Sequence, residues 1–153
     1  MPKLVLVSAI LIAAILFYLN RGYFFPEMFL TPQELREFGN DIQKTRAGID
    51  IYKLLHKDQY PDLQTLGWKP LIEPSTIDGS FDAADGQLQE PFLHSARVNP
   101  LTHSSTIYFI DFDPLSDFRA STEYGFVYNT HSHQFWGIDA RGQIFDDHKY
   151  RHP

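Results

Sequence analysis

The apolar and polar positions divide the chain into an apolar N-terminal segment and a largely polar remainder. Residues 4–19, LVLVSAILIAAILFYL, form an unbroken apolar run in which Ser8 is the single polar side chain. As a helix rising about 1.5 Å per residue, the run reaches roughly 24 Å, slightly less than the hydrocarbon thickness of a bilayer. Lys3 and Arg21 flank it and can reach the headgroups on either side. We therefore expect residues 1–21 to form a transmembrane anchor, with lipid contacts from Leu4, Val5, Leu6, Val7, Ile10, Leu11, Ile12, Ile15, Leu16 and Phe17.

A cleavable signal peptide is the alternative interpretation of this segment. The charged stretch ahead of the apolar run is short, and residues 20–26, NRGYFFP, offer no pair of small residues that a signal peptidase would accept. Retention as an anchor is therefore favoured. The N-terminal amine and Lys3 oppose a single Arg21, which favours a cytoplasmic N-terminus and a domain on the other side of the membrane.

A juxtamembrane linker, residues 22–30, leads to a long amphipathic helix. Thr31, Pro32 and Glu34 give the start signal, a capping box with proline at the first helical position. Apolar residues then recur three or four positions apart, and the pattern ends near residues 56–59, before Tyr60-Pro61. This stripe predicts a helix that packs on the domain's own sheet through Leu35, Phe38, Ile42, Ile49, Tyr52 and Leu55.

The rest of the chain predicts a long connection followed by a small sheet. Proline and glycine interrupt residues 61–100 repeatedly, with a brief helix expected around Leu63–Leu66. Aromatic-rich runs follow at residues 106–112, 124–128, 134–138 and 143–145, which is typical of strands. Short turns between the later runs favour an antiparallel meander. The expected fold class is α+β, with the long helix packed on a small antiparallel β-meander in one domain, residues 31–153.

Composition narrows the function classes. The chain has 13 Lys and Arg against 19 Asp and Glu, a net charge of −6, so nucleic acid is not an expected partner. It has no cysteine, which excludes a disulfide framework and a thiolate metal site. It contains neither a nucleophile elbow nor a glycine-rich phosphate loop, and we do not expect an enzyme.

Three segments, in this order, resemble the type IV pilin and type II secretion pseudopilin family, especially its major pseudopilin branch. Ile42–Leu66 resembles the helix end that precedes a Tyr-Pro stop, and Asn99–Ile107 the Asn-Pro turn leading into the sheet. Gly125–Gly142, GFVYNTHSHQFWGIDARG, resembles the hairpin whose second strand ends in Asp-x-x-Gly. Residues 1–19 contain no glycine and no acidic residue, so the family's prepilin cleavage motif and its membrane-embedded glutamate are missing.

The resemblance implies a structural protein of a type II secretion or type IV pilus-type machine. Such a protein would be a single-pass protein of the bacterial inner membrane, with a periplasmic or extracellular domain and other pilin-like subunits as partners. The alternative is an extracytoplasmic binding or sensor module on a pilin-like fold that does not enter filaments. Incorporation into sheared filaments would separate the two.

Two clusters of polar residues are candidates for metal binding. Asp111, Asp113 and Asp117 form an acidic loop, and oxygen-rich loops suit calcium. Because major pseudopilins carry calcium in a loop beside the sheet, the resemblance makes these three residues the candidate Ca²⁺ ligands. His131 and His133 flank Ser132 within a predicted hairpin turn, where polar residues are usually solvated, and zinc would need three or four converging ligands.

Overall fold

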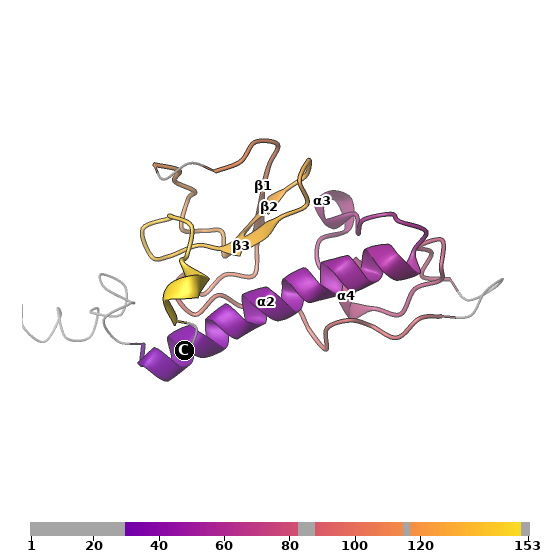
Figure 1. Cartoon of the computed structure of the whole chain (residues 1–153), viewed down its shortest axis with the longest axis horizontal. Helices are drawn as coiled ribbons and strands as arrows, with labels where there is room; N and C mark the ends of the chain where they lie inside the picture. Colours follow the sequence, from indigo (N-terminus) through magenta and orange to yellow (C-terminus); the bar gives the residue numbers. More distant parts are fainter. Residues whose placement is uncertain (1–29, 83–87, 115–116, 151–153) are drawn as a thin grey trace, which may run out of the picture.

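The computed structural model describes residues 30–82, 88–114 and 117–150, and Figure 1 shows their arrangement. A long helix, α2 (Pro32–Leu55), runs along one side of a sheet made of β1 (Ile107–Ile110), β2 (Phe126–Asn129) and β3 (Phe135–Gly137). Two short helices, α3 (Leu63–Leu66) and α4 (Lys69–Ile72), lie in the connection, and a 3-10 turn, η2 (Asp147–Tyr150), packs on α2. The fold class is α+β, as the sequence predicts.

The predicted anchor, residues 1–21, and nearly all of the linker lie outside the described residues. Within residues 30–82, 88–114 and 117–150, no helix combines the length and the apolar character needed to cross a membrane.

The start of α2 follows the predicted capping box. The hydroxyl of Thr31 accepts a hydrogen bond from the backbone N–H of Glu34, and the Glu34 carboxylate accepts one from the backbone N–H of Thr31, at 2.7 Å. These two bonds satisfy N–H groups that the first turn of a helix cannot satisfy by itself. At the other end, the backbone N–H of His56 donates to the carbonyl of Tyr52, and α2 ends where the stripe predicts.

One face of α2 is buried, with one correction to the predicted set. Leu35, Phe38, Ile42, Ile49 and Tyr52 are all buried. The prediction that Leu55 packs on the sheet is wrong, because Leu55 is 41% exposed and the buried stripe continues through His56 instead. His56 lies one turn beyond Tyr52, where its Nδ1 is 2.8 Å from the Tyr52 carbonyl and its Nε2 is 2.9 Å from the Ser75 hydroxyl.

The sheet corrects the predicted topology. Its order is β1-β2-β3, and the hairpin of β2 and β3 is antiparallel, with Val127 opposite Trp136. The expectation of a fully antiparallel meander is wrong, because β1 and β2 run parallel, with Ile107 opposite Phe126. The connection of residues 111–125 is long enough to carry the chain back to the other end of the sheet, as parallel pairing requires. The expected fourth run, residues 143–145, forms only an isolated antiparallel bridge between Ile138 and Ile144.

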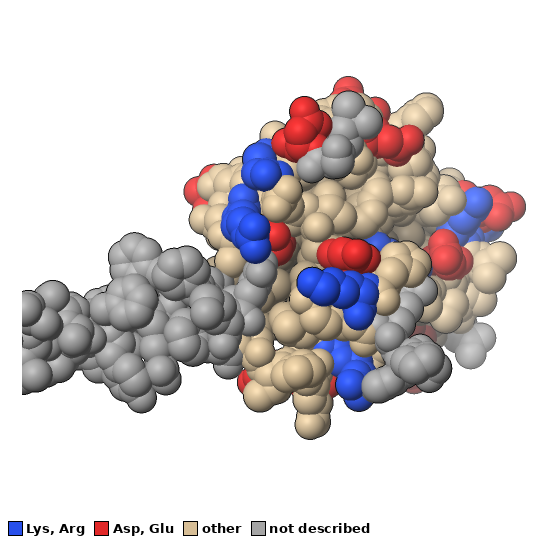
Figure 2. Space-filling view, turned by 60° about the vertical axis from the view of Figure 1, so that its left-hand side comes forward, with Lys and Arg blue, Asp and Glu red and all other residues tan. Residues whose placement is uncertain are grey.

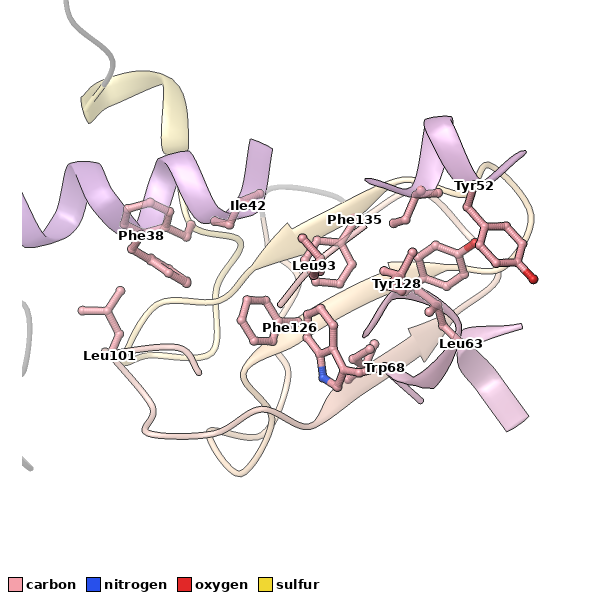
Figure 3. Close-up of a cluster of buried hydrophobic side chains, with 14 of the residues drawn as sticks. Phe38, Ile42, Tyr52, Leu63, Trp68, Leu93, Leu101, Phe126, Tyr128 and Phe135 are labelled. Atoms are coloured by element: carbon pink, nitrogen blue, oxygen red, sulfur yellow. The ribbon is translucent and has the colours of Figure 1, made fainter. Parts of the chain in front are cut away.

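An aromatic core joins the helix to the sheet, as Figure 3 shows. Phe126 and Phe135 stack with ring centroids 5.2 Å apart, and Trp68 meets both rings edge-on. The indole N–H of Trp68 donates to the carbonyl of Ser105 at 2.7 Å, so this large side chain is buried without losing a hydrogen bond. The opposite face of the sheet carries a smaller cluster around Ile110, Val127 and Ile138. Both faces of the sheet are therefore covered, and interaction surfaces must lie on α2, at the sheet's edges or in the loops.

Candidate functional site

The last two turns of α2 expose an apolar surface on the side of the helix away from the core. Ile51, Leu54 and Leu55 are 46%, 74% and 41% exposed, and we call these three residues the α2 patch. Their spacing of three and four places them on one helical face. At about 100° per residue, this face lies opposite the stripe that contains Ile49 and Tyr52. Contiguous exposed apolar side chains on an otherwise polar domain mark an interaction site more often than scattered ones do.

A shallow hollow of about 390 Å³ continues the α2 patch along the helix. Ile51 belongs to both surfaces, and Phe92 and Leu93 form the opposite wall of the hollow. This wall lies close to the helix, since a Cβ at Gly48 would be 3.4 Å from the Cβ of Phe92. Charged side chains border the hollow, with Asp41 lying 3.6 Å from Arg97 and 3.9 Å from Lys44. The combined surface has an apolar centre and a mixed-charge border, which is the usual composition of a protein interface.

The predicted packing residues include Leu55 but neither Ile51 nor Leu54. The sequence nevertheless contains a signal that indicates this surface. A helix that packs one face on a sheet needs a single apolar stripe, but residues 47–55 also carry apolar side chains half a turn away from it. This second apolar face is the signal, because the domain's own sheet covers only the first.

A polar pocket of about 390 Å³ lies on the β3 side of α2, at the end of the β2–β3 hairpin. The imidazole of His133 stacks on Tyr60 with ring centroids 3.6 Å apart, and its Nδ1 lies 2.8 Å from the hydroxyl of Tyr128. The Lys53 ammonium sits 4.7 Å from the centre of the Tyr60 ring. The pocket is lined by Arg46, Asp50, Tyr60, Ser132, His133, Gln134, Trp136 and His148.

Burial controls the protonation of this cluster. It lowers the pKa of His133, and the nearby positive charges of Lys53 and His131 lower that pKa further. Burial also raises the pKa of the Tyr128 hydroxyl well above its ordinary value, with further contributions from Tyr60 and Asp62. At neutral pH the two side chains are therefore a neutral imidazole and a neutral phenol joined by a hydrogen bond. Through these two contacts, His133 joins the turn of the hairpin to Tyr128 and Tyr60.

The three predicted calcium ligands lie in the connection that leaves β1. Asp111, Asp113 and Asp117 are all exposed, and Asp113 Oδ1 accepts a hydrogen bond from the side-chain amide of Asn129 at 3.1 Å. Among the residues that the structure describes, no group of three or more His, Asp or Glu side chains is arranged to hold a metal. The calcium site stays a prediction, and a rise in melting temperature at millimolar Ca²⁺ would support it.

Comparisons with protein-family models, with curated proteins and with solved structures found no match to this chain. The surfaces of the domain and the residues that resemble pilins are therefore the guides to its function.

Proposed function

We propose that this chain is a membrane-anchored, pilin- or pseudopilin-like structural protein that takes part in the assembly of a type II secretion or type IV pilus-type machine. Residues 4–19 hold it in the bacterial inner membrane, and the domain lies in the periplasm or outside the cell. Its partners are the lipid bilayer and other pilin-like subunits. It contacts the subunits through the α2 patch and the adjoining hollow.

The observation that supports this proposal is the second apolar face of α2. One face of this 24-residue helix packs on the domain's aromatic core, while Ile51, Leu54 and Leu55 face outward. Burying an exposed leucine-sized side chain is worth about 1.5–3 kcal/mol, so an apolar partner helix would gain stability by packing here. A chain held in a membrane meets its neighbours sideways, so a contact surface on the flank of a long helix suits lateral assembly.

The arrangement of the segments that carry the resemblance also supports the proposal. The Tyr-Pro stop follows the end of α2, the Asn-Pro turn directly precedes β1, and Gly125–Gly142 contains the β2–β3 hairpin. Asn99 fixes the turn to the hairpin, since its side-chain amide donates to the carbonyls of Gly125 and Ile138. The parallel pairing of β1 departs from the antiparallel meander that the turns and aromatic runs of the sequence predict.

Site-specific photocrosslinking in the host's membranes tests this proposal. A photoreactive amino acid at Leu54 should give an adduct with an identified pilin-like subunit or with a second copy of this chain. Gln33, exposed on the first turn of the same helix, is the matched control and should give no such adduct. Adducts of equal yield at both positions, or release of the intact chain by alkaline carbonate, would refute the proposal.

A second candidate function is a single-pass binding or sensor module, and the polar pocket beside His133 favours it. Aromatic walls with a few converging polar groups are typical of small-molecule sites. If the chain is absent from sheared filaments and Leu54 forms no adduct with pilin-like chains, while substitutions of Trp136 and Asp50 abolish its cellular role, this second function replaces the first.

A further inference from the structure

Strand β1 forms an edge of the sheet, on the side away from α2. The strand order β1-β2-β3 gives β1 a single neighbour, and α2 packs on β3 at the opposite side. Among the helices and strands of the described residues, β2 is the only one in extensive contact with β1. No helix or strand of the described residues therefore packs extensively on the outer side of β1, although Gln64 of α3 lies beside it.

The backbone groups of β1 alternate between β2 and this outer side. The carbonyls of Thr106 and Ile110 accept hydrogen bonds from the β2 side, from the N–H groups of Phe126 and Thr130. Because successive peptide groups in a strand point in opposite directions, the N–H and C=O groups of the odd-numbered residues face outward. Among the described residues, no backbone or side-chain group bonds to the outward N–H and C=O groups of Ile107 and Phe109 or to the N–H of Asp111.

This edge lacks several of the features that normally prevent strand addition, although β1 is short, with four residues. Natural edge strands are protected by lysine, proline, bulges or a covering helix, because open N–H and C=O groups pair readily with another chain. The run Thr106–Phe112, TIYFIDF, contains neither lysine nor proline, and all of its residues except Asp111 favour strands. A hollow of about 440 Å³ lies beside β1, lined by Gln64 of α3, Tyr108–Phe112 and Thr130. The edge therefore has both unpaired backbone groups and adjacent space.

The C-terminal end of the edge is acidic. Asp111 and Asp113 are exposed, and neither forms an ion pair within the described part of the chain. Figure 2 shows acidic side chains at the top of the molecule, where Figure 1 places the connection from β1 to β2. Two unpaired carboxylates beside an open edge favour a segment that brings a positive charge to this end.

We propose that the β1 edge is a docking site for an extended segment of a partner protein, which adds to the sheet as a fourth strand. The outward groups of Ile107, Phe109 and Asp111 form the backbone ladder, and a lysine or arginine of the segment lies beside Asp111 and Asp113. In antiparallel pairing, the more stable arrangement per residue, this basic residue precedes the strand-forming part of the segment. The site is separate from the α2 patch and does not depend on the assembly role proposed above.

Amide hydrogen exchange with the full-length chain in detergent micelles tests this site. The probe is a synthetic peptide of two lysines followed by alternating valine and threonine, with free N–H groups throughout. In the chain alone, the amide of Ile110, which faces β2, should exchange slowly, and those of Phe109 and Asp111 should exchange rapidly. Saturating peptide should slow exchange at Phe109 and Asp111 by about tenfold or more, without a comparable change at Ile110.

Two matched controls separate the backbone ladder from the charge. A peptide of the same sequence, N-methylated at alternate residues, cannot form the ladder and should give no protection. Asp111→Asn should weaken binding of the lysine peptide by about threefold, with a smaller effect at high salt. Glu37→Gln removes a carboxylate on the exposed surface of α2 and should leave the affinity unchanged.

Three results would overturn the inference. The first is that the peptide does not bind at millimolar concentration, and the second is that the N-methylated peptide binds as tightly as the unmethylated one. The third is that, without peptide, the protection of the Phe109 and Asp111 amides rises with protein concentration. The last result would identify a second copy of this chain, paired through β1, as the occupant. None of these results depends on whether Leu54 crosslinks to a pilin-like subunit.

Discussion

The hydroxyl of Tyr128 and the Nδ1 atom of His133 lie 2.8 Å apart across the β2–β3 hairpin. His133 has a positive φ of 59°, a conformation that non-glycine residues adopt infrequently, and its ring stacks on Tyr60. Through these contacts, the turn of the hairpin is attached to the segment that follows α2. The end of the long helix and the end of the sheet are thus joined by one imidazole.

This contact predicts a loss of stability in mild acid. The pKa of His133 lies below its ordinary value of 6.5, so the folded chain favours the neutral imidazole. At pH values between the lowered pKa and 6.5, the unfolded chain binds more protons than the folded chain does. The free energy of unfolding therefore decreases as the pH is lowered across that interval. The stabilisation that comes from the neutral imidazole of His133 is complete above the ordinary pKa of histidine. It is lost as the pH falls through the lower pKa that His133 has in the folded chain. Urea unfolding of the full-length chain in micelles, from pH 7.5 down to pH 4.5, measures it.

The control is His133→Asn, because asparagine tolerates a positive φ and does not titrate. This variant should be less stable than the parent at pH 7.5, and the difference between the two should shrink as the pH falls. The same pH dependence in both proteins would show that other histidines cause the loss.

Asn99 predicts a large and local effect on stability. Its side chain is fully buried, donates to the carbonyls of Gly125 and Ile138 at 2.6 and 2.7 Å, and accepts from the N–H of Leu101 at 2.8 Å. Asn99→Ala should lower the free energy of unfolding by about 2–4 kcal/mol, because it leaves buried backbone groups without partners. Asn40→Ala, on the exposed face of α2, should change it by less than about 0.5 kcal/mol. Urea titration at neutral pH distinguishes the two, and comparable losses would contradict the assigned role.

The helix was predictable because its signals are local. The Thr31–Glu34 capping box and the apolar spacing from Leu35 to Tyr52 lie within one segment, and both follow from helix geometry. Leu55 was misplaced because His56, a titratable residue, takes the next buried position. A histidine can be buried there because the Tyr52 carbonyl and the Ser75 hydroxyl satisfy both ring nitrogens, and Ser75 is distant in sequence.

The direction of β1 and the polar pocket depend on long-range contacts. The alternation of side chains is the same in parallel and antiparallel strands, so residues 106–112 carry no mark of their direction. The one available signal of parallel pairing is the length of the connection, residues 111–125. It is longer than a hairpin loop and as long as a parallel crossover requires. The pocket joins Arg46 and Asp50 of α2 to His133 and Trp136, and no local pattern links positions so far apart.

Two glycines predict opposite effects of the same substitution. A Cβ at Gly137, where β3 passes under α2, would lie 2.5 Å from Phe38 Cζ and 2.8 Å from Ile42 Cδ1. Gly137→Ala should therefore lower the free energy of unfolding by about 1–3 kcal/mol through overpacking. At Gly39 the nearest atom would be the Asp147 Cβ at 3.7 Å, an ordinary contact. Gly39→Ala should raise stability by about 0.5–1 kcal/mol, because alanine favours the helix. Thermal and urea unfolding measure both variants, and destabilisation by Gly39→Ala would show that α2 and η2 are closer than described.

The α2 patch predicts that assembly and stability can be separated. Leu54 is 74% exposed, so Leu54→Glu removes little buried surface and should change the free energy of unfolding by less than about 0.5 kcal/mol. In the host, the same change places a charge at the centre of the proposed contact and should reduce crosslinked complexes by about tenfold or more, since an unpaired charge is costly to bury. Gln33→Glu adds the same charge on an exposed polar turn of α2 and should leave the complexes intact. Quantitative immunoblotting after crosslinking, beside urea unfolding of the same proteins, gives both values. If Leu54→Glu unfolds the domain, the leucine belongs to its core, and if neither value changes, subunits meet through another surface.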